Sequence, residues 1–252
     1  MRDTRERFTD RVADYVRYRP GYPVAVRQLM ERELGLGPAS VVADLGSGTG
    51  ILSRLLLGSG ARVFGVEPNA AMRAAAEAEL TGQPRFVSID GTAEATTLAP
   101  ASVDLATAGQ AFHWFDVART RLELERVLRP GGGVALVWNV RASTPFNDDY
   151  EELLLRFAPE YPEVRARDRV SETAVRTLLA PGEVRVARFP NRQRLDEQSL
   201  RGRLMSSSYA PKPGAPTHEA MSARLREIFA AHAAGGAVEM AYDAVVYWGR
   251  LG

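Results

Sequence analysis

The chain has 252 residues, a hydrophobic share of 45% and a formal net charge of +1 at pH 7. This length and composition indicate a soluble globular protein with a sizeable core, arranged as one large domain or two small ones. The balanced charge provides no bulk attraction to nucleic acid or to an anionic membrane, and the absence of cysteine excludes disulfides, thiolate nucleophiles and cysteine metal sites.

The N-terminal segment MRDTRERFTDRVADYVRYRP is charged throughout, and no segment reaches the ~18 consecutive apolar residues that a membrane span needs. We therefore expect a cytoplasmic protein without a membrane anchor. The same region predicts two helices, over residues 4–18 and 23–34, because RPGYP forces the chain to bend between them.

Five short, β-rich and almost wholly apolar runs follow, as expected for strands that are buried on both faces. They lie at residues 41–45, 61–67, 85–89, 103–108 and 133–139. Helical patterns separate them in ILSRLLLGSG, NAAMRAAAEAEL and DVARTRLELERVL, with expected ends at Gly58 for the first and at Pro130 and Gly131 for the third. This alternation predicts a doubly wound α/β fold built on a parallel sheet.

The rest of the chain has a different pattern. A polar, proline-containing stretch after Asn139 predicts one or two helices, interpreted as an insertion. Two further strands are expected at 183–195 and 237–250, as an antiparallel addition to the sheet edge, with helices near 196–206 and 217–233 between them.

We therefore expect one domain over residues 1–252, in which helical elements cover the ligand-binding edge of the sheet. Its expected parts are an N-terminal helical lid (1–38), a cofactor-binding core (39–140), cap elements (141–182 and 196–235) and final strands (183–195 and 237–250).

A glycine turn, DLGSGTG (residues 44–50), joins the first strand to the first of these helices. In an open α/β sheet this turn lies at the carboxyl edge, where ligands bind. Because glycine allows positive φ and a close approach, we expect free N–H groups of the turn and of the first helical turn to face an anion or a polar ligand atom.

The spacing of the turn separates two classes of ligand. A dinucleotide fingerprint, GxGxxG, needs its third glycine at position 51, where the chain has Ile51. The carboxylate of Asp44 would repel a pyrophosphate, but it suits a ligand that carries an ammonium and a sulfonium. S-adenosylmethionine is such a ligand. Glu67 ends the second strand about 20 residues past the first glycine, where an acidic side chain can accept hydrogen bonds from ribose hydroxyls.

The segments DLGSGTG, VEPNAAM, GTAEATTL, AGQAFHWFD and VLRPGGGVALVWN resemble the successive motifs of class I S-adenosylmethionine-dependent methyltransferases. More narrowly they resemble the small-molecule branch that includes trans-aconitate methyltransferase-like proteins. The resemblance is strong up to Asn139 and weak beyond it. It implies a Rossmann-like seven-stranded sheet of order 3-2-1-4-5-7-6, with strand 7 antiparallel and helices on both faces.

The resemblance also implies roles for single residues. Gly46, Ser47 and Gly48 would lie along the methionine portion of the cofactor, with Asp44 near its ammonium. Glu67 would hold the ribose, Pro68 would pack by the adenine and Gln110 would touch the cofactor.

The chain departs from the common GDAE pattern of these relatives. It has GTAE, with Thr92 where relatives often have an acid. Adenine recognition is therefore expected either from backbone groups of Thr92 and Ala93 or from Asp90, and the sequence leaves both open.

Methyl transfer from a sulfonium is an in-line displacement, so the protein mainly has to align the acceptor and stabilise shifting charge, and no metal is required. His113 is the best candidate for a general base, because its ordinary pKa is near neutrality and it follows the fourth strand. The alternative is that His113 and Trp114 only pack the loop.

Aromatic and basic residues of the N-terminal segment are candidates for covering the site. Tyr15 and Tyr18 share one helix face and could shield the sulfonium, Arg19 could pair with the methionine carboxylate, and Tyr22 could reach the acceptor. The alternative is that these aromatic rings attach a helix to the core while Arg19 is exposed.

Further candidates for acceptor contacts come from later in the chain. They are Trp114, Asn139, Arg141, Arg203, Ser208 and Tyr209. An arginine-lined pocket would favour a carboxylate acceptor, and an aromatic metabolite is the other acceptor class that we consider.

The sequence thus predicts a methyltransferase that acts on a small-molecule acceptor, without nucleic-acid or membrane partners. A binding or regulatory protein that has kept the nucleotide pocket but not the chemistry is the first alternative, and an NAD(P)-dependent reductase is the second. Methylation of RNA or protein would be expected to need an appended binding domain or a basic tract. The sequence does not indicate the oligomeric state.

Overall fold

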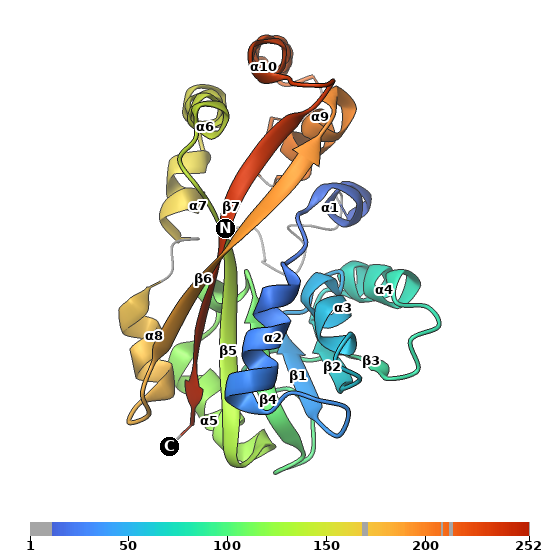
Figure 1. Cartoon of the computed structure of the whole chain (residues 1–252), viewed down its shortest axis with the longest axis vertical. Coiled ribbons are helices and arrows are strands. Elements are labelled where there is room, and N and C mark those ends of the chain that lie inside the picture. Colours follow the sequence, from blue (N-terminus) through green and yellow to red (C-terminus); the bar gives the residue numbers. More distant parts are fainter. Residues whose placement is uncertain (1–11, 168–170, 208, 212–213, 252) are drawn as a thin grey trace. The chain divides into compact units, whose positions relative to one another are not determined.

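The structure is a computed structural model that describes residues 12–167, 171–207, 209–211 and 214–251. Its sheet has seven strands in the order β3-β2-β1-β4-β5-β7-β6, and β7 runs antiparallel to its neighbours (Figure 1). The strands are β1 (Val41–Leu45), β2 (Arg62–Val66), β3 (Phe86–Ile89), β4 (Val103–Gly109), β5 (Leu128–Arg141), β6 (Arg185–Leu195) and β7 (Val238–Arg250). The predicted fold class and strand order are confirmed.

Helices follow the predicted positions closely except after β5. The expected one or two helices there are three, because a capping Thr144 begins α6 and a capping Ser171 begins α8. The helices are α1 (Val12–Tyr18), α2 (Val24–Leu34), α3 (Ile51–Leu57), α4 (Ala70–Glu79), α5 (Val117–Val127), α6 (Pro145–Phe157), α7 (Tyr161–Arg167), α8 (Glu172–Leu179), α9 (Glu197–Met205) and α10 (His218–His232). Among the described residues, no helix is long and apolar enough to cross a membrane.

Strand β5 begins five residues earlier than the sequence predicts. Helix α5 ends at Val127, and Leu128 is already extended and pairs with Val103. The pairing then shifts, so that Leu105 faces Gly133, and Gly131 takes a φ of 75° in the intervening bulge. The proline and glycines of this segment suggested a turn, but the partner strand recruits them into the sheet.

Contacts divide the chain into two compact units. Unit 1 comprises residues 1–20, 140–169 and 190–243, and unit 2 comprises residues 21–139, 170–189 and 244–252. Helices α2 and α8 both pack within unit 2. The division into lid, cofactor-binding core and cap stays a prediction.

Unit 2 has a hydrophobic core on each face of its strands. Ala43 and Leu45 of β1 point to one cluster, which α5 and α8 cover, while Val42 between them points to the other, which α2 and α3 cover (Figure 1). This alternation is the two-residue period of a strand, and each large aliphatic side chain buried this way contributes about 1.5–3 kcal/mol. The paired faces fix the position of the β1–α3 turn.

Unit 1 has a separate core, formed mainly by α6, α9 and α10. Tyr150, Leu154, Leu204 and Met221 are fully buried in it. Its tyrosines are packed among aliphatic side chains, so their hydroxyl groups need polar partners inside the unit.

Candidate functional site

The glycine turn between β1 and α3 needs glycine at two positions for different reasons. Gly46 has a φ of 63°, and a Cβ there would lie 2.7 Å from the Cβ of Ala111. Gly48 has a φ of 55°, but a Cβ there would meet nothing within 4 Å. Gly46 is therefore required for packing, whereas the space beside Gly48 is open.

The amide groups of this turn are engaged within the protein. Gly46 and Ser47 donate to the carbonyl oxygen of Val66, at 2.8 and 3.1 Å, and Gly48 donates to Oε2 of Glu67 at 3.0 Å. The amide of Gly50 donates to Ser47 at 2.9 Å. The prediction of free amides is wrong for these four residues, because the turn is bonded to the end of β2. What the turn offers a ligand is the open space beside Gly48.

Glu67 follows β2 and links the glycine turn to α4. Its Oε1 accepts a hydrogen bond from the amide of Asn69 at 2.9 Å, opposite the bond from Gly48 to Oε2. Burial raises the pKa of this carboxyl group, and the two amide bonds oppose the rise. Each carboxylate oxygen has a second lone pair, so Glu67 can still accept hydrogen bonds from two ligand hydroxyls.

Asp44 is fully buried at the end of β1. Its two oxygens accept hydrogen bonds from the hydroxyls of Ser53, at 2.6 Å, and Thr107, at 3.0 Å. Burial raises its pKa to about 6, and the charge of Glu67 adds to the rise. Asp44 thus ties β1 to α3 and β4, and its contact with a ligand ammonium stays a prediction.

Two residues that the sequence reasoning missed hold Glu67 in place. Asn69 caps α4, where its side chain accepts from the amides of Ala71 and Met72, at 3.0 and 3.1 Å. Arg73 donates to the carbonyl oxygen of Glu67 at 2.8 Å. An asparagine before a helical run is a recognisable capping signal, but nothing in the sequence marks Arg73.

The candidates for adenine recognition are partly engaged elsewhere. The carboxylate of Asp90 pairs with both terminal nitrogens of Arg73, at 3.0 and 2.9 Å, and its side chain is 73% exposed. The backbone N–H and C=O of Thr92 both bond to Ala95, while Ala93 is buried. Pro68 lies between the two anchored residues Glu67 and Asn69, partly exposed.

Three predicted residues gather at the carboxyl ends of β4 and β5. Gln110 has a positive φ of 55°, unusual for a residue with a side chain, and its Oε1 accepts from the amide of Asn139 at 3.2 Å. The Asn139 side chain donates to Gly21 at 3.0 Å, and the neighbouring Tyr22 hydroxyl would lie 2.8 Å from a Cβ on Gly109. The positive φ of Gln110 costs on the order of 1–3 kcal/mol and persists only where the surrounding structure enforces it. Backbone strain of this kind is common at ligand sites.

His113 and Trp114 follow in a short 3-10 helix, Phe112–Trp114. Their rings lie 4.8 Å apart between centroids at an angle of 50°, and both are partly exposed. The ring contact fits the packing alternative, and it leaves His113 three residues from Gln110. The general-base role of His113 stays a prediction.

The remaining predicted residues belong to unit 1. The Tyr18 ring is only 8% exposed, because it packs against Gly202 of α9 where a Cβ would overlap it. This geometry favours the packing role for Tyr18. Tyr15 lies under the guanidinium of Arg19, 4.8 Å from its centroid to Cζ. Ser208 lies outside the described residues.

Three arginines of unit 1 share one set of tyrosines. Arg19 follows α1, Arg141 ends β5 and Arg203 lies in α9, and the phenol of Tyr209 is within electrostatic range of all three. Tyr150 is in range of Arg141 and Arg203. We call Arg19, Arg141, Arg203, Tyr150 and Tyr209 the arginine cluster.

The arginine cluster contains little compensating negative charge. Arg141 pairs with Glu151 at 2.6 Å, but the same carboxylate also pairs with Arg165, at 2.8 Å. Arg19 and Arg203 have no carboxylate partner among the described residues. Arg19 donates to the carbonyl of Ser206, and Arg203, which is 6% exposed, donates to the hydroxyl of Ser207.

Burying the guanidinium groups of the arginine cluster costs more free energy than their aromatic contacts return. Moving a guanidinium out of water without an ionic partner costs several kcal/mol. A cation–π contact, such as that between Arg19 and Tyr15, contributes about 0.5–2 kcal/mol. Burial lowers the pKa of Arg19, and the like charge of Arg203 lowers it further. The pKa of Arg203 is raised instead, because its burial is outweighed by the nearby tyrosines, Tyr242 first. Tyrosines are neutral near pH 7, so at that pH they supply hydrogen bonds and aromatic contact to the two arginines but no compensating charge.

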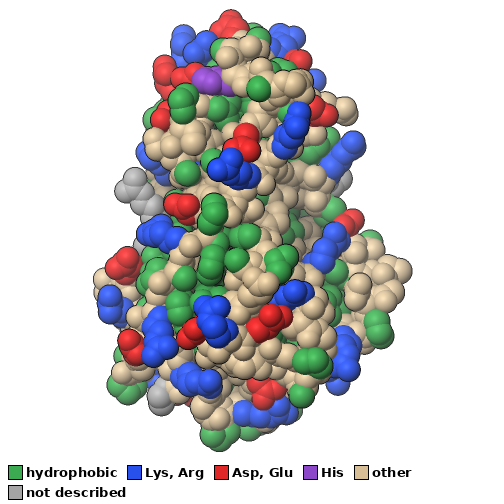
Figure 2. All heavy atoms as spheres, in the orientation of Figure 1, with side chains coloured by type: hydrophobic (Ala, Val, Ile, Leu, Met, Phe, Trp, Pro, Cys, Tyr) green, Lys and Arg blue, Asp and Glu red, His purple; other side chains and the backbone are tan. Residues whose placement is uncertain are grey.

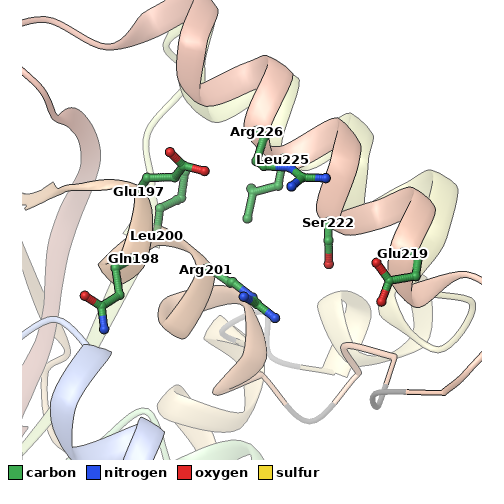
Figure 3. A pocket seen from close by; sticks show the side chains of 8 residues that line it. All are labelled: Glu197, Gln198, Leu200, Arg201, Glu219, Ser222, Leu225 and Arg226. Atoms are coloured by element: carbon green, nitrogen blue, oxygen red, sulfur yellow. The ribbon is translucent and has the colours of Figure 1, made fainter.

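A hollow between α9 and α10 is unrelated to these residues. It lies within unit 1, and Figure 3 shows charged side chains of both signs around it, among them Glu197, Arg201 and Glu219. No predicted site residue lines this hollow, and its open, mixed-charge wall indicates no particular ligand.

The fold and the glycine turn together define a class of protein. A seven-stranded sheet of this order, with an acidic residue after β2 bonded to a glycine turn after β1, is the arrangement of class I S-adenosylmethionine-dependent methyltransferases. Residues 43–136 match the family described as "Methyltransferase domain", which places the match in the part of the chain that carries the glycine turn and Glu67. The narrower trans-aconitate methyltransferase-like branch stays a prediction.

Individual relatives agree with this class. An uncharacterised methyltransferase of Mycobacterium tuberculosis is 42% identical over 141 residues, which cover 56% of this chain and 55% of that protein. The chain thus spans about half the length of this curated relative. An uncharacterised methyltransferase-like protein of Schizosaccharomyces pombe is 29% identical over 231 residues, 88% of this chain and 85% of that protein.

Solved structures give the same fold. A protein named as a type II methyltransferase, from Anaeromyxobacter dehalogenans, superposes with a TM-score of 0.68 at 29% identity, covering 93% of this chain and 98% of that one. Geranyl diphosphate C-methyltransferase from Streptomyces coelicolor, in complex with S-adenosyl-L-homocysteine, shares the fold alone, with a TM-score of 0.51 at 16% identity over 90% of this chain and 75% of that one.

Proposed function

We propose that the protein transfers a methyl group from S-adenosylmethionine to a small-molecule acceptor in the cytoplasm. One observation carries the cofactor assignment. Glu67 is held by the amides of Gly48 and Asn69 with lone pairs to spare, next to the open space beside Gly48. A ribose diol needs such a pair of acceptors, and a ligand chain can lie along a glycine without a side chain to displace.

The residues of unit 2 would divide the work of binding. Glu67 would accept from the ribose hydroxyls, while Gly46, Ser47 and Gly48 would border the methionine portion. Pro68 and Ala93 would provide apolar contact for the adenine. Asp44 would supply negative charge behind the turn, which favours a cationic ligand over a pyrophosphate.

S-adenosylmethionine would supply a methyl group on a positively charged sulfur, from which an acceptor atom displaces it in line. The protein's part is to align the acceptor and to exclude water. Gln110, fixed in a strained conformation and bonded to the amide of Asn139, is suited to positioning a ligand at the ends of β4 and β5. Tyr22 and Trp114 would contact the acceptor there.

His113 would act as a general base only if the acceptor atom has to lose a proton. In that case His113→Ala reduces turnover by ~100-fold or more, with unchanged cofactor affinity. His113→Asn and Trp114→Phe serve as controls for packing of the 3-10 helix. A loss of less than threefold in His113→Ala supports the packing alternative.

Calorimetry with the full chain tests the cofactor assignment. We expect S-adenosylhomocysteine to bind and NADH not to bind. Glu67→Ala should weaken the binding of S-adenosylhomocysteine by about 1–3 kcal/mol, which is the cost of leaving its polar partners unpaired. Glu77→Ala, an exposed carboxylate on the neighbouring helix, is the matched control. Binding of NADH alone would favour the reductase and reject this proposal.

Turnover distinguishes an enzyme from a binding protein. S-adenosylhomocysteine binding without methylation of any compound in a broad acceptor panel would support the regulatory alternative. On the face shown in Figure 2, arginines alternate with acidic side chains without a continuous basic patch. This mixed surface supports a small acceptor over nucleic acid, whose binding would instead show a steep salt dependence.

A further inference from the structure

The arginine cluster of unit 1 contains polar atoms that the protein itself does not satisfy. The Nε atoms of Arg19 and Arg203 and the hydroxyl of Tyr150 are buried, and each lacks a hydrogen-bond partner among the described residues. Arg203 is 6% exposed and Tyr150 is fully buried. Buried donors of this kind are rare in folded proteins and usually belong to a ligand or an ordered water.

These three atoms can all donate a hydrogen bond, two of them from a guanidinium Nε and one from a phenol hydroxyl. Nε of an arginine is one arm of a planar fork that matches the two oxygens of a carboxylate. A phenol hydroxyl can add a third hydrogen bond to the same anion. Arg19 and Tyr209 are partly exposed, so a solute has a route to these donors.

The net positive charge of the arginine cluster also favours an anionic ligand. Among the described residues, Glu151 is the one carboxylate that pairs with the cluster. It is shared by Arg141, Arg165 and the hydroxyl of Tyr161, so it cannot also neutralise Arg19 and Arg203. Two cations of like sign at close range repel each other, and an anion bound between them would remove both the repulsion and the cost of burial. The aromatic faces around them provide only a partial substitute.

We propose that Arg19, Arg203 and Tyr150 form a binding site for the carboxylate of a small organic acid. The binding site itself does not depend on the proposed methyl transfer.

Thermal unfolding of the full chain without cofactor tests the binding site. Sodium acetate, succinate and benzoate are compared with sodium phosphate and sodium chloride at one ionic strength. We expect at least one organic carboxylate to raise the unfolding temperature by several degrees, in a saturable manner, while chloride does not. A saturable rise with phosphate alone overturns the carboxylate assignment, and no saturable rise with any anion overturns the site.

Variants locate the response. Arg203→Gln, which keeps a polar amide but removes the charge and shortens the side chain, should weaken carboxylate binding by at least tenfold. Arg203→Lys, which keeps the charge but not the fork, should weaken carboxylate binding less. Arg192→Gln is the control, because Arg192 lies in the same unit but is exposed and paired with Glu239 at 2.8 Å. Equal affinity in the wild-type chain and in both Arg203 variants overturns the proposal.

A second measurement separates this proposal from the methyltransferase assignment. S-adenosylhomocysteine affinity, measured by calorimetry without a carboxylate, should be the same in Arg203→Gln as in the wild-type chain. If Glu67→Ala no longer binds S-adenosylhomocysteine but its unfolding temperature still rises with the carboxylate, the two sites are independent.

Discussion

Buried charge is handled differently in the two compact units. In unit 2, Asp44 and Glu67 each accept two hydrogen bonds from the same unit. In unit 1, Arg19 and Arg203 have only neutral hydrogen-bond acceptors among the described residues. The difference teaches that the buried carboxylates of unit 2 are hydrogen-bonded without any ligand. In unit 1 the burial of two guanidinium groups destabilises the fold, and a bound anion would reduce this destabilisation.

The glycine turn gives the largest expected effect. Gly46→Ala should destabilise the protein by roughly 2–5 kcal/mol, because alanine is disfavoured at positive φ and its Cβ collides with Ala111. Gly48→Ala, with open space around the new methyl group, should cost only about 1–2 kcal/mol. Urea unfolding measures both, and equal costs would show that the turn is not packed as described.

Gly48→Ala also has a second readout. If a cofactor lies beside this turn, the alanine side chain of the variant should lower the affinity for S-adenosylhomocysteine at least tenfold, a larger effect than its effect on stability. An unchanged affinity would move the cofactor away from the open side of Gly48.

Asp44 gives the next largest effect. Its pKa is raised from 3.8 to about 6 in the folded protein, so the folded state holds the proton more tightly than the unfolded state. The contribution of Asp44 to stability is therefore most favourable at low pH, falls as the pH rises from about 4 to 6, and is then constant. The total fall is about 2–3 kcal/mol.

Asp44→Asn removes this titration. Urea unfolding between pH 4 and 8 should show a smaller decline in unfolding free energy for the variant than for the wild-type chain. Parallel pH profiles would mean that Asp44 is not the buried carboxyl that titrates here. The residual decline in the variant belongs to Glu67, whose pKa is also raised by burial.

Arg203 tests the other half of the comparison. Arg203→Met should leave stability unchanged or raise it by up to about 2 kcal/mol in the absence of an anion, because an apolar side chain of similar length avoids the cost of burying the charge. Arg192→Met, at an exposed ion pair, should change it by less than about 1 kcal/mol. Destabilisation by more than 1 kcal/mol in Arg203→Met would show that unit 1 does neutralise this cation.

Asp90 gives the smallest expected effect. Its side chain is exposed and its carboxylate is held by Arg73, so Asp90→Ala should change stability by less than about 1 kcal/mol. We expect S-adenosylhomocysteine affinity to change by less than twofold. A tenfold loss would assign adenine recognition to Asp90 instead of to the backbone near Thr92 and Ala93.

The strands and most helices could be predicted because buried parallel strands are continuous apolar runs bounded by turn residues. The start of β5 could not, since residues 128–132 have the composition of a turn and join the sheet only through the partner strand. Pairing between strands is a tertiary effect that local composition does not record.

The site was predictable in outline. The spacing of Gly48 and Glu67 correctly indicated two elements that end at the same edge of the sheet, but it did not show that the amide of one bonds to the carboxylate of the other. The lack of charge compensation around Arg203 could not be predicted either, because arginine is common throughout the chain and only packing determines which arginine is buried.

The two units differ in how continuous they are along the chain, and this affects both sequence comparison and protein engineering. Residues 21–139 stay within unit 2 without interruption, and the match to known methyltransferase domains, 43–136, falls inside that stretch. Unit 1 is assembled from three dispersed segments. No single cut can therefore excise it, and replacing unit 1 by that of a relative would require exchanging all three segments together.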